Sequence, residues 1–123
     1  MNSRQFDPID HLTVTVTSVR TVTTVAVSGE IDMTTRDVMA EQLFEQLDAA
    51  PAALVIDLTK IEFMGSAGLA VLIEAHQRTS QGTTFAIVAP DPSAACRTLA
   101  VSGLDQLLPV HHTIDEAMRS PDR

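Results

Sequence analysis

The serine at position 66 combines a reactive hydroxyl with a recognisable structural setting. It lies in Gly65-Ser66-Ala67-Gly68, between an apolar run at 53–58 and a pattern at 69–76 with helical spacing. A hydroxyl at the start of a helix can cap the first turn. It also lies near the partial positive charge of the helix N-terminus, which stabilises an anionic group such as a phosphate. The residues alone leave both interpretations open: a helix N-cap, or a hydroxyl that carries a phosphate.

A carboxylate, Asp32, is the second candidate. It follows the β-branched run at 22–27, as Ser66 follows the run at 53–58. Loops that leave the carboxyl ends of neighbouring parallel strands gather at one edge of the sheet. We therefore expect Asp32 and Ser66 to face the same partner. Asp is also common just before a helix, so a structural role at the start of the next helix is the alternative.

Catalytic and metal-binding motifs are weak in this sequence. The nucleophile elbow Gly-x-Ser-x-Gly would need glycine at position 64, where the chain has Met64. No lysine follows the glycines as a P-loop requires, and the histidines and single cysteine lack the spacing of a metal site. Asp91 followed by the pair His111 and His112 has the order of a hydrolase triad, so a small serine hydrolase is kept as an alternative. We expect no enzyme activity, no cofactor and no metal.

Composition narrows the classes of partner. The length of 123 residues indicates one domain, with an ordered core expected at about 11–119. The net charge of -8 argues against nucleic acid and against an anionic membrane surface. No apolar run approaches the ~20 residues of a membrane span, and the N-terminus lacks the apolar segment of a signal peptide. One cysteine fits a reducing compartment. A cytoplasmic protein with a protein partner is expected.

The predicted order of elements is β-β-α-β-α-β-α-β-α. Strands at 12–17 and 22–27 alternate or are β-branched and should pair as an antiparallel hairpin. A capping box at Thr34-Thr35-Arg36-Asp37 predicts a helix that stops before Pro51. The strand at 53–58 should then lie parallel to the second strand, because a helix is the usual crossover between parallel neighbours.

The remaining elements complete an α/β fold. A helix after Ser66 should end near Gly82, and a strand is expected at 83–89. A helix with Pro92 in its first turn should end at Gly103, before a strand at 107–110 and a helix at 113–119 capped by Thr113. Residues 1–10 are expected to be a loose lead-in and 120–123 to fray. The fold class is a single α/β domain with a mostly parallel sheet, an N-terminal β-hairpin and helices packed on the sheet.

Two motifs resemble those of the STAS-domain anti-sigma factor antagonists. They are Ser28-Gly29-Glu30-Ile31-Asp32 and the stretch from Asp57-Leu58-Thr59 to Phe63-Met64-Gly65-Ser66-Ala67-Gly68-Leu69. The resemblance covers nearly the whole chain and implies a STAS-like binding module without catalysis. It further implies that the unphosphorylated protein binds an anti-sigma factor, itself a serine kinase, and so frees a sigma factor for transcription. The kinase would phosphorylate Ser66, and a serine phosphatase would restore it.

The resemblance also assigns a partner surface. Its expected members lie in the two motifs: Glu30, Asp32, Gly65, Ser66, Ala67 and Gly68. One position departs from the family pattern, since the family usually has Asp directly before the serine and this chain has Gly65. That departure keeps a second interpretation open, a STAS module that is not phosphorylated and serves a transporter or a signalling complex.

Overall fold

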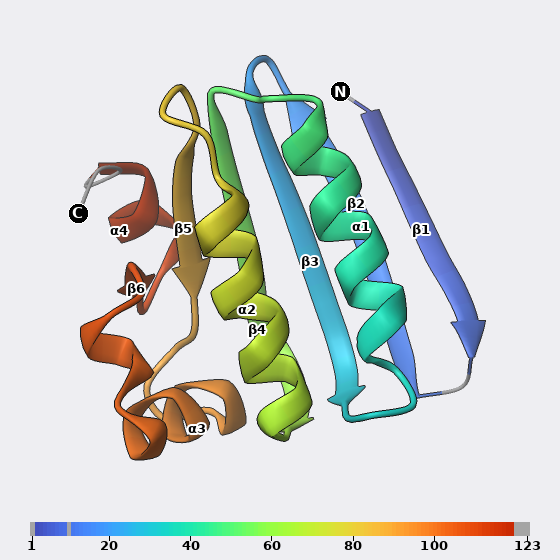
Figure 1. Ribbon diagram of the computed structural model, residues 1–123, viewed down its shortest axis with the longest axis vertical. Helices are drawn as coiled ribbons and strands as arrows, with labels where there is room; N and C mark the ends of the chain where they lie inside the picture. The colour runs from blue at the N-terminus through green and yellow to red at the C-terminus, as the bar shows by residue number, and fades with distance from the viewer. Residues whose placement is uncertain (1, 10, 120–123) are drawn as a thin grey trace.

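A six-stranded sheet in which spatial order follows chain order, β1 to β6, organises the described part of the protein (Figure 1). The computed structural model describes residues 2–9 and 11–119, with backbone only for 2–9 and 119. Its strands are β1 (Asn2–Ile9), β2 (Leu12–Val19), β3 (Val22–Ile31), β4 (Ala53–Met64), β5 (Thr84–Val88) and β6 (Val110–His111). The first three pair antiparallel, whereas β3, β4, β5 and β6 are parallel. The predicted fold class is confirmed.

The helices cover both faces of the sheet unequally. They are α1 (Arg36–Asp48), α2 (Ser66–Arg78), α3 (Ala94–Ser102) and α4 (Ile114–Arg119), with a 3₁₀ turn, η1, at Leu104–Gln106. Helices α1 and α2 lie side by side over one face (Figure 1). Ala117 of α4 packs with Val55, Ala86 and Val88 on the opposite face. No helix within residues 2–9 and 11–119 is long and apolar enough to cross a membrane.

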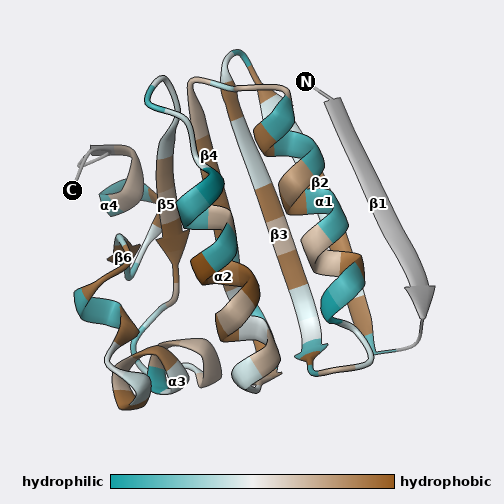
Figure 2. Cartoon of the chain, in the orientation of Figure 1, coloured by the Kyte–Doolittle hydropathy of each residue, from teal (hydrophilic) through white to brown (hydrophobic). Residues whose placement is uncertain are grey.

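The main core lies between the sheet and the pair α1 and α2. Alternate side chains of β2 and β3 point into it, including Val14, Val25 and Val27, because successive residues of a strand face opposite sides. Leu43 of α1 and Leu72 of α2 are fully buried against them. Figure 2 shows apolar segments in β3, β4 and β5 beneath α1 and α2, whose residues alternate between apolar and hydrophilic. Burial of aliphatic side chains is therefore what joins the helices to the sheet.

The prediction of a loose lead-in at 1–10 was wrong for the part that the structure describes. Residues 2–9 form β1, which pairs antiparallel with β2 and extends the hairpin to three strands. The sequence did not signal this strand, because it is mostly polar and carries Pro8. Such a composition is tolerated at the edge of a sheet, where one side of the backbone has no partner strand. The predicted fraying of 120–123 lies outside the described residues.

Several predicted boundaries also move. Strand β4 continues from Ala53 to Met64 instead of ending at 58, and α2 ends at Arg78 rather than near Gly82. Pro92 precedes α3, because the hydroxyl of Ser93 accepts the amide of Cys96 at 3.1 Å and makes Ser93 the N-cap. The segment at 107–110 is a strand only at Val110, because β6 spans Val110–His111 and residues 107–109 form the turn that connects it to η1.

Two predicted caps are confirmed in the C-terminal third. Gly103 ends α3 with a φ of 79°, a left-handed conformation that favours glycine. The hydroxyl of Thr113 accepts the amide of Glu116 at 3.1 Å at the start of α4.

Candidate functional site

The carboxyl ends of β3 and β4 lie together and bring both candidate residues to one edge of the sheet. Ile31 and Met64 are paired as the last residues of the two strands, and the amide of Gly65 donates to the carbonyl of Ile31 at 3.0 Å. Asp32 and Ser66 follow directly, and α1 and α2 both begin at this edge (Figure 1). The predicted convergence of Asp32 and Ser66 is confirmed.

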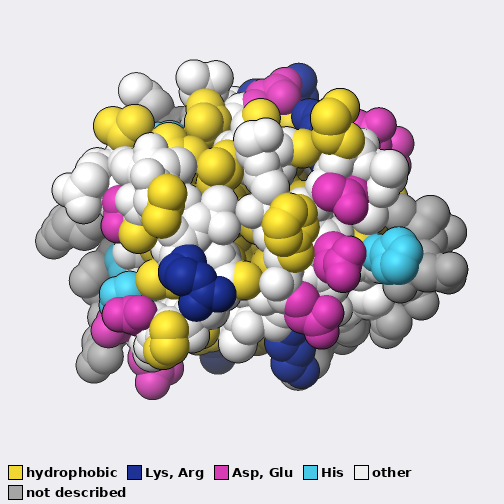
Figure 3. Space-filling view, turned by 90° about the horizontal axis from the view of Figure 1, so that it is seen from below, with side chains coloured by type: hydrophobic (Ala, Val, Ile, Leu, Met, Phe, Trp, Pro, Cys, Tyr) yellow, Lys and Arg dark blue, Asp and Glu magenta, His cyan; other side chains and the backbone are white. Residues whose placement is uncertain are grey.

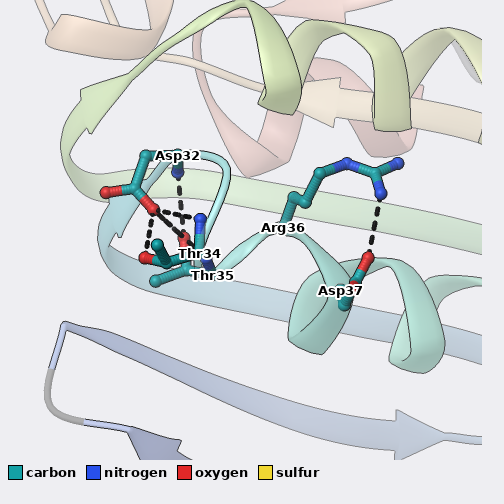
Figure 4. Close-up of polar contacts among 5 residues, drawn as sticks. All are labelled: Asp32, Thr34, Thr35, Arg36 and Asp37. Carbon is teal, nitrogen blue, oxygen red and sulfur yellow. Dashed lines mark hydrogen bonds and ion pairs between the residues drawn. The ribbon is translucent and has the colours of Figure 1, made fainter.

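Asp32 organises the turn between β3 and α1. Its Oδ1 accepts hydrogen bonds from the amide of Thr34 at 2.9 Å, the hydroxyl of Thr34 at 2.7 Å and the amide of Thr35 at 3.1 Å (Figure 4). Donation by the Thr34 hydroxyl is the main cause that lowers the pKa of Asp32 from its ordinary value of 3.8. The second carboxylate oxygen makes no hydrogen bond within the described residues, and in Figure 4 it points away from the turn. The structural and functional interpretations of Asp32 are therefore compatible.

Thr35 fixes this turn from the inside. It is fully buried; its hydroxyl donates to the carbonyl of Glu30 at 2.8 Å and accepts the amide of Asp32 at 2.9 Å. The predicted capping box was wrong, because Thr35 is the N-cap of α1 without a side-chain cap bond and Asp37 pairs instead with Arg36 at 2.9 Å. Sequence reasoning missed Thr35; a threonine three residues after the aspartate was the available signal.

The Ser66 side chain is exposed at the first turn of α2. Ser66 is the first residue of α2, and Gly65 is the N-cap, with no side-chain cap bond at this end of the helix. The side chain is exposed, and the described residues offer it no hydrogen bond, so the prediction of a serine N-cap was wrong. Within the described residues no histidine is hydrogen-bonded to Ser66, and His112 Nδ1 lies 3.2 Å from the carbonyl oxygen of Ala89.

The two glycines beside Ser66 have different reasons to be glycine. Gly68 is buried, and a Cβ there would lie 2.7 Å from Met64 Cγ and 2.8 Å from Ile31 Cγ2. Gly68 therefore lets the first turn of α2 pack closely against the ends of β3 and β4. This packing positions Ser66 at the edge of the sheet. Gly65 has a φ of -92°, and a Cβ there would meet the nearest atom, Phe63 Cε2, at 3.4 Å. The backbone at position 65 therefore has room for a Cβ.

Apolar and acidic side chains belong to the two loops of this edge. Met33, which directly follows Asp32, is 81% exposed, and Phe63, two residues before Gly65, is 52% exposed. Ala67 is half-buried, and so is Glu30, two residues before Asp32. Figure 3 looks onto this edge of the molecule and shows separate apolar side chains among acidic ones. Within the described residues no cluster of His, Cys, Asp and Glu could hold a metal ion.

Comparison with known proteins places this arrangement in a family. The family model described as STAS domain matches residues 13–117. The anti-sigma-F factor antagonist RsfB of Mycobacterium tuberculosis is 35% identical over 109 residues, which cover 89% of this chain and 88% of that protein. The crystal structure of an anti-sigma factor antagonist from Mycobacterium paratuberculosis matches with a TM-score of 0.84 at 36% identity, covering 89% of this chain and 93% of that one.

A more distant structure has the same fold. The anti-sigma factor antagonist SpoIIAA in its unphosphorylated form matches with a TM-score of 0.68 at 16% identity, covering 85% of this chain and 92% of that one. The resemblance drawn from the two sequence motifs is confirmed by the family model and by relatives that are aligned over most of their length. The chain belongs to the STAS-domain family of anti-sigma factor antagonists.

Proposed function

We propose that this protein is an anti-sigma factor antagonist that binds an anti-sigma factor in the cytoplasm and thereby frees a sigma factor. The binding surface is the sheet edge formed by the loops after β3 and β4, with Asp32, Glu30, Gly65, Ser66 and Ala67. The observation that carries the proposal is the exposed Ser66 hydroxyl, which has no hydrogen bond within the described residues. At the same edge of the sheet, the Asp32 carboxylate accepts three hydrogen bonds from Thr34 and Thr35 of its own turn. The names of the relatives support the same function.

Phosphorylation of Ser66 is the proposed switch. The anti-sigma factor acts as the serine kinase, and a serine phosphatase restores the binding form. A phosphate adds close to two negative charges at neutral pH, and the N-terminus of α2 accommodates an anion on the protein's own side. The partner surface, which fits a small hydroxyl, would have to bury that charge unpaired beside the ionised Asp32. A penalty of ~3 kcal/mol reduces affinity by roughly a hundredfold, which is enough to separate the complex.

Gly65 favours a second candidate function. The family usually has aspartate before its serine, and the backbone at position 65 has room for a Cβ. Packing therefore does not require glycine at this position. A STAS module that is not phosphorylated, serving a transporter or a signalling complex, would need no kinase recognition at this position. The serine hydrolase alternative has no comparable support, because no histidine base is hydrogen-bonded to Ser66 in the described structure.

A phosphorylation assay tests the switch. The protein is incubated with radiolabelled ATP and the anti-sigma factor that it retains in a pull-down, next to the variants Ser66→Ala and Ser80→Ala. Ser80 is an exposed serine in the loop after α2 and serves as the matched control. We expect label on the wild type and on Ser80→Ala and none on Ser66→Ala. Binding of the anti-sigma factor without any label would support the unphosphorylated module. Labelling of Ser66 by a serine-reactive phosphonate would support the hydrolase.

A further inference from the structure

Two β-bulges interrupt the pairing of β3 with the carboxyl half of β4. They affect the face of the sheet that α1 and α2 do not cover. The register between β3 and β4 shifts between Ala26 and Ser28, where two residues of β4 lie opposite Val27. It shifts again between Gly29 and Glu30, where Glu62 has no partner. Bulges in parallel pairs are rare and are treated as functional features, often beside binding sites. The proposed switch at Ser66 makes no use of this pair.

The bulges bring charged side chains to the surface. A regular strand would alternate buried and exposed residues, but here Thr59 and Lys60 are both exposed, and so are Glu62 and Phe63. The neighbouring strands add hydroxyls to the same face, because Thr15 and Ser28 alternate with buried valines. Helix α4 packs farther along the sheet, against Val55 and β5, and α1 and α2 lie on the other face (Figure 1).

A groove follows from this geometry. It consists of two hollows of about 340 Å³ and about 380 Å³ that share Ser28 and Lys60 in their walls. The first is lined also by Thr15, Asp57 and Thr59. The second reaches the carboxyl edge of the sheet, where His11, Glu30 and Glu62 line it.

The charged side chains of the second hollow have no charged partner within the described structure, whereas Asp57 of the first hollow accepts hydrogen bonds from the amide and hydroxyl of Thr59. The ion pairs between described residues lie elsewhere, between Arg36 and Asp37 and between Arg78 and Glu74. The side chains of Glu30, Lys60 and Glu62 make no ion pair or hydrogen bond with a described residue. The second hollow therefore contains two carboxylates, of Glu30 and Glu62, and one ammonium group, of Lys60, in a chain of net charge -8.

We propose that this groove binds an extended segment of a partner protein and that an arginine of that segment enters the second hollow. A planar guanidinium has five N–H donors and can bridge two carboxylates, whereas a compact ammonium group acts as a point charge. The hydroxyls of Thr15 and Ser28 can bond the backbone of the segment in the first hollow. This contact shares Glu30 with the proposed anti-sigma surface, but it does not use Ser66 and does not depend on the phosphorylation switch.

Nuclear magnetic resonance on the ¹⁵N-labelled full chain tests the groove without an anti-sigma factor. The probes are the tripeptide acetyl-Gly-Arg-Gly-amide, its matched control acetyl-Gly-Gln-Gly-amide, and inorganic phosphate. We expect the arginine peptide to shift the amide signals of Ser28, Gly29, Lys60 and Glu62 saturably, and the glutamine peptide to leave them unmoved. The shifts should weaken as salt is added, because the carboxylates are solvent-accessible.

Paired variants decide whether the carboxylates carry the binding. We expect Glu30→Gln with Glu62→Gln to weaken the arginine peptide at least tenfold. The control, Glu41→Gln with Glu45→Gln on the exposed side of α1, should leave its affinity unchanged. Equal binding of both peptides, or unchanged binding to the Glu30 and Glu62 variant, would overturn the proposal. Shifts caused by phosphate and not by the arginine peptide would also overturn it, since they would mark an anion site at Lys60.

Discussion

Replacement of Thr35 by valine removes one hydroxyl and keeps the shape of the side chain. The Thr35 side chain is 0% exposed, so no water can replace the lost oxygen. Two backbone groups lose their partner: the carbonyl of Glu30, at 2.8 Å, and the amide of Asp32, at 2.9 Å. A buried group left without a hydrogen bond costs ~1–3 kcal/mol. We therefore expect the free energy of unfolding to fall by about 2–4 kcal/mol.

Thr35→Ser is the matched control, because it keeps the hydroxyl and removes only a methyl group. Loss of one buried methyl group costs about 1 kcal/mol. Urea unfolding of the two variants separates the effects, and the valine variant should be the less stable one. In the folded fraction, Thr35→Val should also bind the anti-sigma factor less tightly, because Asp32 is held less firmly. If valine and serine at position 35 gave equal stability, the assigned role of the hydroxyl would be refuted.

Three further predictions concern the same edge of the sheet. Asp32→Asn should lower the free energy of unfolding at neutral pH. Because the pKa of Asp32 is lowered in the folded state, the difference in stability between wild type and variant is present above pH 3.8 and vanishes as the pH falls through the lowered pKa. Urea unfolding across pH 2–7 would measure this difference. Gly68→Ala should destabilise by up to about 2 kcal/mol, since a clash with Met64 and Ile31 costs ~1–3 kcal/mol and better helix propensity returns ~1 kcal/mol; a rise in stability in thermal unfolding would contradict the close packing. Gly65→Asp should raise the free energy of unfolding by about 0.3–1 kcal/mol by placing a carboxylate at the N-terminus of α2, and a clear loss of stability would show that the Phe63 ring needs the space.

The main elements could be predicted because each has a local signal. Thr13, Thr15 and Thr17 alternate with buried residues in β2, and the crossover rule then sets β3 and β4 parallel, which brings Asp32 and Ser66 together. The bulges at Thr59 and Glu62 have no such signal, because a shift of register depends on the partner strand.

The details of the site depend on contacts that are not local. The buried Thr35 hydroxyl bonds the carbonyl of a residue five positions earlier, and the sequence pattern favoured a capping box in its place. The sequence pattern favoured Ser66 as the N-cap of α2, but the N-cap is Gly65, one residue earlier. Because of this shift, the Ser66 hydroxyl makes no cap bond to a described residue. Helix boundaries are uncertain by one or two residues, so the sequence could not decide this point.

Titration calorimetry of three proteins against the anti-sigma factor tests the central claim most directly. The proteins are the wild type, Ser66→Ala and Ser66→Glu, each shown to be folded by its thermal unfolding. Ser66→Ala should bind as tightly as the wild type, because a methyl group fits where the hydroxyl does. Ser66→Glu should bind roughly a hundredfold more weakly, because its charge must be buried against the partner. Binding of Ser66→Glu with wild-type affinity would contradict the account.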